Sequence, residues 1–538
     1  NGQERRFTYD DAGQRLSESW TGTGQTLNWT YNEAGLVTRE AGPDGSLDID
    51  YFPTGRIRNL THANPGAPGW QMDYVYDGNG NVSQVTDSGG GVTSYEYDGL
   101  DRMTAVQQTG TGVLDKRVEF QYNDAGLLIT VTRFGDLAGA VPGPITDIEY
   151  ACESCASEPT RIEHRRPDGS TIHELVYTRN ALGQITQLVD AEGTHQYVYD
   201  GRGWLVDVTH PAVPGLNSGA ITYDGMGNWL TLPGRPGPAS LSYAAGQGGH
   251  RLLSDGAATY AYDDEGNLVE RTETASGDTL SFAYDPDGRV VQATLRDDLD
   301  AVISDASLGY TPFGARTLTE VDGQRRHFVY DGVNVAAALD DTGSVLWRRL
   351  HTRTIDRPLA VDDGNTIQWL LTDHNGTIRD VVDTAGQTLA HFAYTAFGEQ
   401  VLGPDPSLDD AVRFTGREFD LPGGVGYYRA RLYDPANARF ISEDPVEPWH
   451  YRYAENDPLR YSDPTGETAT LELIGVLCTT AASVSIAKGF GLVVDEALKQ
   501  AAGGLQGQPG DVDAILEKLR DTGNPKNLLP CGFGELLP

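Results

Sequence analysis

The stretch of sequence that determines the fold reads YVYDGNGNV at residues 74–82. The aromatic side chains of Tyr74 and Tyr76 lie two positions apart, so they share one face of a β-strand. Asp77 and the glycines after it supply turn chemistry, because Asp bonds to nearby backbone amides and Gly accepts a positive φ. The chain then reverses into a second strand at about residues 81–85, so the unit is predicted to be a β-hairpin.

The same pattern recurs along the chain, with successive tyrosines between 19 and 28 positions apart. Clear copies lie at 7–16, 197–203, 221–228, 260–263, 282–285 and 328–331, and weaker copies centre on Tyr31, Tyr51, Tyr97, Tyr122, Tyr150, Tyr177, Tyr243 and Tyr310. A single hairpin is only marginally stable, so the repeats are expected to join edge to edge. Twist accumulates along so long a sheet, which therefore has to coil or close.

These features predict an all-β fold in which a long spiral sheet of hairpins forms a hollow shell or barrel. A set of separate β-sandwiches or a propeller is the alternative. Propeller blades contain four strands and roughly 40–50 residues each. A repeat of about twenty residues therefore favours the continuous spiral.

The composition agrees with a turn-rich β protein, since 65 glycines and 26 tyrosines accompany only 3 methionines. The net charge of −37 argues against nucleic acid or anionic lipid as partners and indicates a marine, halophilic or extracellular setting. Four cysteines in 538 residues are too few for a disulfide scaffold. No signal peptide is visible, so a processed form or an excised fragment is expected.

Longer motifs follow the repeats. They read WLLTDHNGTIRD at 369–380, FAYTAFGE at 392–399, RFTGRE at 413–418, GYYRARLYDP at 426–435 and ARFISEDP at 438–445. Together they resemble the Rhs-associated core, with Ala438 where that family often has Gly. The hairpin units resemble the YD repeats of Rhs proteins, of the BC component of Tc toxins and of animal teneurins. The resemblance covers residues 1 to about 467.

The resemblance implies three parts. Residues 1–368 would form a hollow shell of YD hairpins, and residues 369–467 an Rhs-associated core that coils inward and plugs one end. Residues 468–538 would be a variable C-terminal segment, often a toxin, caged inside. In bacterial relatives the plug is an aspartyl autoprotease that cuts the chain once. The enzyme activity implied is thus a single self-cleavage, with no turnover of a small molecule and no cofactor.

The family is cut just after a Pro-x4-Asp-Pro-x-Gly-Leu motif, and residues 458–467 of this chain read PLRYSDPTGE. An aspartyl protease needs two neighbouring carboxylates, one ionised to activate water and one protonated. Asp444 and Asp463 are the first choice for this pair, and Asp457 is the runner-up. Arg439 is a supporting candidate, because its guanidinium could pair with a carboxylate.

The predicted scissile bond joins Glu467 to Thr468. Glu467 departs from the family, which has Leu there, and the connector from Asp444 to Tyr451 is shorter than the usual one. Asp-Pro steps are also common turn starters. The alternative interpretation is therefore that these carboxylates only bond backbone amides and that the chain stays uncut.

From Thr468 onward Tyr and Trp vanish, and an apolar run over residues 471–502 with helix-forming residues predicts a small helical segment. This segment contains no His and no Ser/His arrangement, which argues against a nuclease or a zinc hydrolase. A helical plug or a caged remnant is the preferred interpretation. A membrane-active toxin is the alternative, because residues 471–494 are apolar apart from Glu472 and Lys488.

One group of residues has the side-chain types of a metal site. Cys152 and Cys155, with His164 and His173 nearby, are ligand types that zinc accepts. Their spacing is loose, so a local disulfide or unpaired thiols is preferred and no metal is predicted. Other histidines, such as His391, are interpreted as packed or exposed residues of the sheet.

The leading functional hypothesis is a containment module of a toxin-delivery system, secreted by or displayed on a bacterial cell. Its partners would be its own C-terminal segment inside the shell and a secretion apparatus or target-cell surface outside it. The alternative is an adhesion or recognition shell at a cell surface, as in teneurins, which carries no toxin.

Overall fold

The computed structural model describes residues 4–151, 158–237, 241–244, 249–403, 412–446, 450–467 and 469–471. Within these residues the fold is almost entirely β, as the repeats predict. Strands that follow one another in sequence pair antiparallel and form two long sheets. The predicted C-terminal helical segment lies almost wholly outside the described residues.

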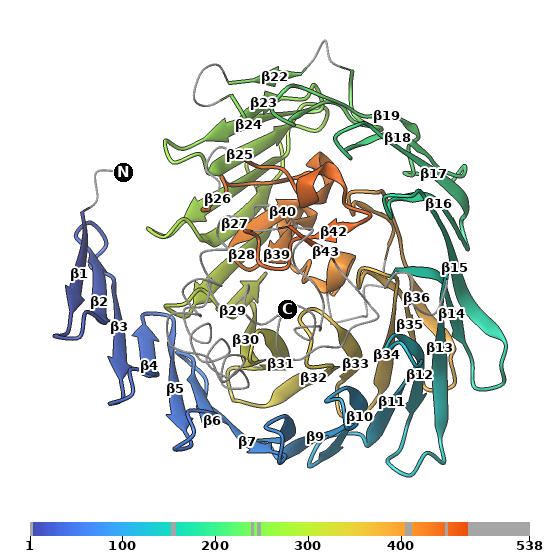
Figure 1. The fold of residues 1–538 in the computed structure, drawn as a ribbon. Helices are drawn as coiled ribbons and strands as arrows, with labels where there is room; N and C mark the ends of the chain where they lie inside the picture. Colours follow the sequence, from blue (N-terminus) through green and yellow to red (C-terminus); the bar gives the residue numbers. More distant parts are fainter. Residues whose placement is uncertain are drawn as a thin grey trace, which may run out of the picture.

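The first sheet follows the chain from its blue end in Figure 1. Its strands are β1 (Arg5–Tyr9), β2 (Arg15–Trp20), β3 (Thr26–Tyr31), β4 (Val37–Gly42), β5 (Gly45–Tyr51), β6 (Ile57–Ala63), β7 (Trp70–Tyr76), β8 (Val82–Asp87), β9 (Gly91–Tyr97), β10 (Met103–Gly110), β11 (Lys116–Tyr122), β12 (Leu128–Phe134), β13 (Pro142–Tyr150), β14 (Pro159–Arg165), β15 (Thr171–Arg179), β16 (Ile185–Asp190), β17 (Gly193–Tyr199), β18 (Leu205–Thr209) and β19 (Gly219–Ala220).

The second sheet contains β22 (Ser242–Tyr243), β23 (Leu252–Ser254), β24 (Ala258–Tyr262), β25 (Leu268–Glu273), β26 (Thr279–Tyr284), β27 (Val290–Arg296), β28 (Val302–Tyr310), β29 (Arg316–Val321), β30 (Gln324–Asp331), β31 (Asn334–Leu339), β32 (Val345–His351), β33 (Pro358–Asp362), β34 (Ile367–Thr372), β35 (Ile378–Val382) and β36 (Thr388–His391). The predicted boundary at residue 369 falls within β34, and the sheet continues beyond it.

Short elements make up the rest. They are β20 (Thr222–Tyr223), β21 (Trp229–Thr231), β37 (Ala393–Tyr394), β38 (Gln400–Leu402), β39 (Gly426–Tyr428), β40 (Arg431–Asp434), β41 (Arg439–Phe440), β42 (Tyr461–Ser462) and β43 (Thr470–Leu471), with 3-10 turns η3 (Phe414–Gly416), η4 (Pro422–Gly424), η5 (Pro435–Asn437) and η6 (Ala454–Asn456).

The sheets are open, so the closed barrel that the sequence left possible is wrong. In the described parts of the chain no ladder joins β19 to β1 or β36 to β22. The expected single wall is also interrupted between β19 and β22, where only the small β20–β21 hairpin forms. Pro211, Pro214, Pro233 and Pro236 lie in or beside this stretch, and proline cannot donate to a β-ladder.

The later strands of the second sheet curl inside the wall made by the first (Figure 1). Successive strands of the first sheet contact successive strands of the second. Tyr74 donates to Asp331 at 2.9 Å, Lys116 pairs with Asp362 at 2.6 Å, and His164 contacts the carbonyl of Thr372 at 3.1 Å. The Lys116–Asp362 pair is fully buried. The two sheets are therefore successive layers of one spiral.

The hairpin turns have the predicted chemistry. The Oδ1 atom of Asp77 accepts the backbone amides of Asn79, Gly80 and Asn81 at 2.7–2.9 Å. Gly80 adopts a φ of +97°, which a residue with a Cβ rarely adopts. The aspartate and glycine of the repeat thus close the turn, as the sequence indicates.

The tyrosine before most of the repeat turns also makes a hydrogen bond that the sequence did not reveal. Its hydroxyl donates to a backbone carbonyl at the start of the second strand of the preceding hairpin, at 2.6–3.1 Å. The pairs are Tyr31–Arg15, Tyr51–Val37, Tyr76–Ile57, Tyr97–Val82, Tyr122–Met103, Tyr150–Leu128, Tyr199–Ile185, Tyr223–Leu205, Tyr243–Trp229, Tyr284–Leu268, Tyr310–Val290, Tyr330–Arg316 and Tyr394–Ile378. We call these bonds the tyrosine ladder.

Two repeats fill the ladder position with another donor. Arg179, rather than the predicted Tyr177, lies at the bulge before its turn and donates to the carbonyl of Pro159 at 3.4 Å. His351 contacts the carbonyl of Val335 at 2.9 Å in the same way. A long side chain with a hydrogen-bond donor can therefore replace tyrosine at this position.

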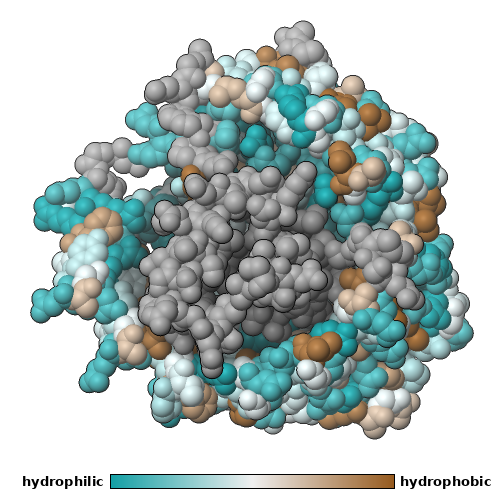
Figure 2. Space-filling model, in the orientation of Figure 1, coloured by the Kyte–Doolittle hydropathy of each residue, from teal (hydrophilic) through white to brown (hydrophobic). Residues whose placement is uncertain are grey.

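The described residues from Val412 onward fold back toward the middle of the spiral, where β39, β40, β42 and β43 are labelled in Figure 1. An aromatic cluster anchors them, and Tyr428, Tyr433, Phe440 and Tyr453 in this cluster have no exposed surface. The face of the molecule in Figure 2 carries mostly hydrophilic residues, with apolar ones scattered among them. This agrees with the net charge of −37.

Candidate functional site

Arg431 lies between the two carboxylates that the sequence predicts as a catalytic pair. Its Nη2 atom is 2.8 Å from Oδ2 of Asp444 and 3.3 Å from Oδ2 of Asp463. All three side chains are buried, and the guanidinium carbon lies 3.7 Å from the ring centre of Phe440. The Oδ2 atoms of Asp444 and Asp463 therefore lie around the same guanidinium nitrogen.

The chain just before the predicted scissile bond is bound to the same site. Oδ1 of Asp463 accepts the backbone amide of Glu467 at 3.1 Å, and Nε of Arg431 donates to the carbonyl of Gly466. The amide of Ala430 donates to the carbonyl of Thr465 at 3.1 Å. Residues 463–467 are thus held against the carboxylate pair through their backbone.

Gly466 is required for this close approach. Its φ is +71°, and an added Cβ would overlap the carbonyl oxygen of Tyr428. Arg429 adds another contact by donating to the carbonyl of Pro464, while both of its terminal nitrogens bind Asp356 at 2.7–2.9 Å. The buried ion pair of Arg429 and Asp356 therefore holds the turn in place.

The charges around the turn have a defined arrangement. Burial raises the pKa of Glu467, and the carboxylates of Asp463 and Asp444 raise this pKa further. Burial also lowers the pKa of Arg431, although Asp463 and Asp444 oppose that change. The guanidinium of Arg431 thus lies among three acidic groups, Asp444, Asp463 and Glu467.

The other predicted site residues lie elsewhere. Asp457 is held against the wall, where Nε2 of Gln184 donates to its Oδ2 at 3.0 Å, and burial raises the pKa of Asp457 to about 6. Arg439 donates to the carbonyl of His250, and its guanidinium lies 4.7 Å from the ring centre of Tyr451. Thr468, on the far side of the predicted scissile bond, is outside the described residues.

The weak alternative for a metal site is only partly described. Cys152 and Cys155 lie outside the described residues. His164 and His173 face each other on neighbouring strands but have different partners. His164 contacts the hydroxyl of Thr146 at 2.9 Å, whereas His173 contacts a carboxylate of the second sheet.

Arg431 was not predicted as a site residue, although it lies in the GYYRARLYDP run at 426–435. Arg429 lies in the two-residue turn between β39 and β40 with a φ of +59°, and Arg431 begins β40. Strand periodicity therefore does not bring them together, and the available signal was only that a guanidinium can bind two carboxylates at once. Both arginines do contact the turn at residues 463–467.

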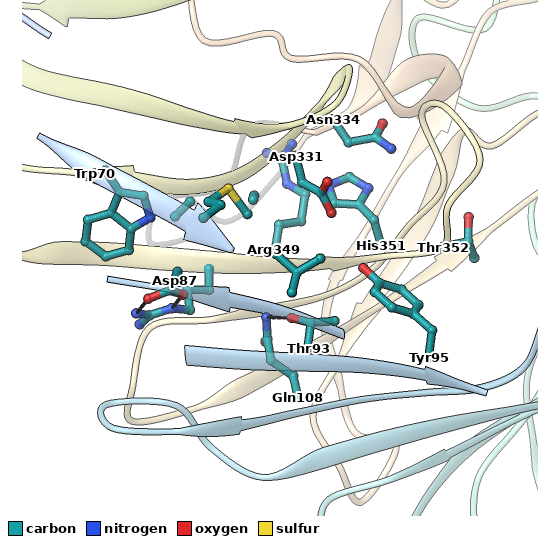
Figure 3. A pocket seen from close by; sticks show the side chains of 15 residues that line it. Trp70, Asp87, Thr93, Tyr95, Gln108, Asp331, Asn334, Arg349, His351 and Thr352 are labelled. Carbon is teal, nitrogen blue, oxygen red and sulfur yellow. Dashed lines mark hydrogen bonds and ion pairs between the residues drawn. The ribbon is translucent and has the colours of Figure 1, made fainter. Parts of the chain in front are cut away.

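A separate pocket lies between the two sheets and is unrelated to this site (Figure 3). Trp70 and Tyr95 line it from the first sheet, and Asp331 and His351 from the second. Asp331 already accepts hydrogen bonds from Tyr74 at 2.9 Å and from Arg353 at 2.5 Å. Its charge is therefore paired, and the pocket is best understood as a seam between layers.

Comparison with known proteins agrees with this architecture. Residues 163–460 match the family model of the teneurin YD-shell, and residues 76–114 match that of the RHS repeat. The chain belongs to the teneurin YD-shell family. The crystal structure of TcdB2-TccC3 shares the fold of this YD-shell chain, with a TM-score of 0.61, 17% identity, and coverage of 86% of this chain and 27% of that one.

Two curated relatives cover most of this YD-shell chain. Double-stranded DNA deaminase toxin A of Burkholderia cenocepacia is 24% identical over 86% of this chain, which spans 39% of that protein. Probable deoxyribonuclease RhsA of Dickeya dadantii is 25% identical over 94% of this chain, which spans 32% of that protein. The chain therefore spans well under half the length of these relatives. Among the described residues, no helix has the length and apolar character needed to cross a membrane.

Proposed function

We propose that this chain is the wall and plug of a YD shell that encloses the polypeptide following Glu467, and that the plug cuts the chain once after this residue. The observation that carries the proposal is the binding of residues 463–467 against Asp444, Arg431 and Asp463. Asp463 accepts the backbone amide of Glu467, and the buried guanidinium of Arg431 contacts both acids.

The chemistry of the proposed cut is that of an aspartyl protease. One carboxylate of the pair removes a proton from a water molecule, which attacks the carbonyl carbon of Glu467. The bond from that carbon to the nitrogen of Thr468 breaks, and the protonated carboxylate supplies a proton to this nitrogen. Arg431 is a positioning residue, because it holds both acids and the preceding carbonyl of Gly466.

The delivery role rests on the family and on the relatives. Several relatives are named as toxins, among them Double-stranded DNA deaminase toxin A and Toxin protein Tse5. A shell that retains its C-terminal segment would keep such an activity contained until delivery. We accordingly propose a secreted or surface-displayed bacterial protein whose cargo is residues 468–538.

A teneurin-like recognition shell is the second candidate. Two observations favour it: the family model that matches residues 163–460 is that of the teneurin shell, and the turn at Asp463 has the same local form as turns of the wall. In this case the chain would remain whole, and the carboxylates of the plug would serve only to fold it.

The intact mass of the purified full chain distinguishes these functions. We expect two fragments that end at Glu467 and begin at Thr468, and one uncut chain for Asp444→Asn. The two fragments should elute together from a sizing column, and the smaller one should resist added protease until the shell is denatured. An uncut wild-type chain would reject self-cleavage, and a small fragment that separates at once would reject enclosure.

A further inference from the structure

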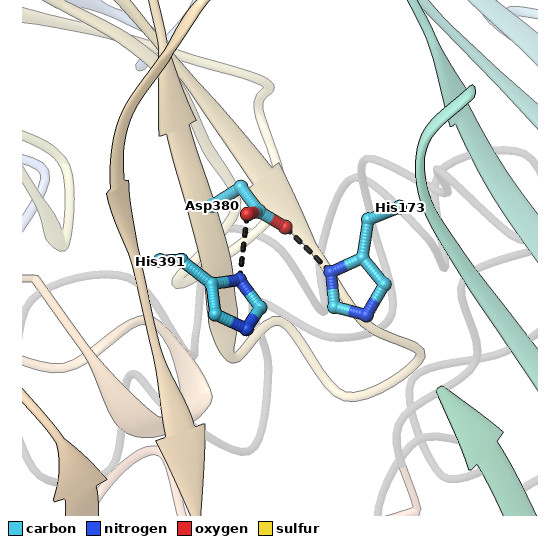
Figure 4. Close-up of side chains that lie close together, drawn as sticks. All are labelled: His173, Asp380 and His391. Carbon is cyan, nitrogen blue, oxygen red and sulfur yellow. Dashed lines mark hydrogen bonds and ion pairs between the residues drawn. The ribbon is translucent and has the colours of Figure 1, made fainter. Parts of the chain in front are cut away.

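A cluster of histidines and carboxylates joins the two sheets (Figure 4). His173 projects from β15 of the first sheet, whereas Asp380 and His391 project from β35 and β36 of the second. The carboxylate of Asp380 contacts both rings, with Oδ2 2.5 Å from Nδ1 of His173 and Oδ1 2.7 Å from Nδ1 of His391. One carboxylate thus orients two imidazoles that come from different sheets.

The second nitrogens of the two rings face away from Asp380 (Figure 4). Nε2 of His391 lies 2.5 Å from Oε1 of Glu192, in the turn between β16 and β17. Nε2 of His173 is buried and has no hydrogen-bond partner among the described residues. Ligand atoms of His173, Asp190 and Glu192 lie within 4.8 Å of one another. A lone pair of His173 is therefore available beside two carboxylates.

The charge of the cluster is not balanced by its fixed cation. Asp190, Glu192 and Asp380 carry three negative charges, while Arg379 supplies one positive charge at 2.9 Å from Asp190 and 3.0 Å from Glu192. These four side chains are 1–7% exposed. Buried charge needs compensation, and protons on the imidazoles, which include His195 at 2.9 Å from Asp190, or one divalent cation would supply it.

We propose that His173, His391 and Glu192 bind one divalent transition-metal ion of the zinc class, while Asp380 orients both rings. Imidazole and carboxylate ligands bind zinc at about 2.0–2.2 Å, so two ligands of one ion lie at most roughly 4.4 Å apart. The ligand atoms of His173 and Glu192 lie within 4.8 Å of each other, so a small side-chain shift brings both within reach of one ion. Nε2 of His391 and Oε1 of Glu192 are in direct contact at 2.5 Å, and they must move apart for the ion to enter between them. A histidine ligand normally gives its other nitrogen to a carboxylate, which is the contact that each ring makes with Asp380.

The ion would act as a clasp between the layers of the spiral. Its ligands come from both sheets, and His173 and Asp380 are 207 positions apart in the sequence. An ion that binds only the folded arrangement stabilises that arrangement by mass action. Of the residues that the sequence suggested for zinc, the proposed site uses only His173, and Cys152 and Cys155 lie outside the described residues.

The direct test is metal binding by the full chain after treatment with a chelator. Titration with Zn2+ alone, followed by calorimetry, should give one ion per chain, and Co2+ should give visible absorption bands of nitrogen and oxygen ligation. Added Zn2+ should raise the melting temperature. His391→Gln and Glu192→Gln should abolish stoichiometric binding, and Asp380→Asn should weaken it about 10- to 100-fold.

Matched variants separate the site from general effects. Asp383→Asn lies in the same β35–β36 hairpin, where its carboxylate accepts only the turn amide of Gln387 at 2.8 Å among the described contacts, and it should bind as the wild type does. The double variant Cys152→Ser/Cys155→Ser should also bind normally. His391 is 25% exposed, so His391→Gln is expected to fold. Lack of saturable binding by the folded wild type, or unchanged binding by folded His391→Gln, would overturn the proposal. If a variant is unfolded by circular dichroism, the Co2+ spectrum of the wild type decides.

Discussion

The turn at Asp77 in the wall and the turn at Asp463 in the plug have the same local form. In both turns, Oδ1 of the aspartate accepts the backbone amide of the residue four positions later. This residue is Asn81, at 2.9 Å, in the wall and Glu467, at 3.1 Å, in the plug. In both, the glycine one position earlier has a positive φ. The plug turn is thus a repeat turn placed in a different setting.

The difference lies at the second carboxylate oxygen. Oδ2 of Asp77 is partly exposed and accepts the neutral side-chain amide of Asn81 at 3.1 Å. Oδ2 of Asp463 is buried beside Arg431, which also contacts Asp444. Local turn chemistry is therefore the same in both regions, and only the packing around the plug gives its aspartate a candidate chemical role.

Replacing each aspartate by asparagine should give the largest difference between the two turns, measured as the rate of self-cleavage. Asp463→Asn keeps an oxygen that can accept the amide of Glu467, but it removes the acid from the proposed pair. A general acid or base contributes about 10²- to 10⁴-fold to a rate, so self-cleavage should slow by that factor, whereas Asp77→Asn should cut normally. Intact mass against time after synthesis measures both rates, and equal rates would remove Asp463 from the mechanism.

Removing a paired arginine should lower the free energy of unfolding more in the plug than in the wall. Arg431→Met leaves two buried carboxylates without their shared partner, which costs about 3–5 kcal/mol in the free energy of unfolding. Arg202, which pairs with the wall-turn Asp200 at 2.9 Å and is 51% exposed, provides the control. Arg202 also lies 3.7 Å from the ring centre of Trp204, so Arg202→Met should lower the free energy of unfolding by about 1 kcal/mol or less. Denaturant titration monitored by tryptophan fluorescence compares them, and similar losses would mean that burial of Arg431 is unimportant.

The repeat pattern was enough to predict the hairpins and their turns, because the roles of Asp77 and Gly80 are local. The tyrosine ladder escaped prediction, since the hydroxyl of Tyr97 reaches a different hairpin and its direction depends on how neighbouring hairpins pair. The motif likewise pointed to Asp444 and Asp463, whereas Arg431 lies 32 positions from Asp463 and meets it only through folding. The contacts between sheets depend on how tightly the spiral coils, which no local pattern encodes.

Two buried glutamates, one in the wall and one in the plug region, should make stability depend on pH in opposite directions. Glu40 of the wall accepts the amide of Phe313 at 3.1 Å, and burial raises its pKa to about 8. Glu418 of the plug region is paired with Arg417 and Arg349, and these guanidinium groups lower its pKa to about 2 against the opposing effect of burial.

The signs of the two pH effects are therefore opposite. The folded chain holds a proton on Glu40 more tightly than the unfolded chain, so stability should fall as pH rises from about 5 to 8, by up to roughly 1.4 kcal/mol per pH unit. Glu40→Gln should remove this loss. Stability from Glu418 is present above its unfolded pKa and is lost as pH falls from about 4.5 toward 2. Melting temperatures of the wild type and Glu40→Gln at pH 6 and pH 8 provide the check, and parallel curves would contradict the assignment.

The smallest expected effect tests the wall itself. Tyr97→Phe removes one bond of the tyrosine ladder, the 2.9 Å contact with the carbonyl of Val82, while it keeps the ring. A net loss of about 1 kcal/mol in the free energy of unfolding is expected. Tyr9 is 57% exposed and makes no ladder bond within the described chain, so Tyr9→Phe is the matched control and should leave stability unchanged. Urea titrations of both variants decide whether the ladder bond stabilises the wall: a loss for Tyr97→Phe no larger than that for Tyr9→Phe would mean that tyrosine recurs at this position for its ring alone.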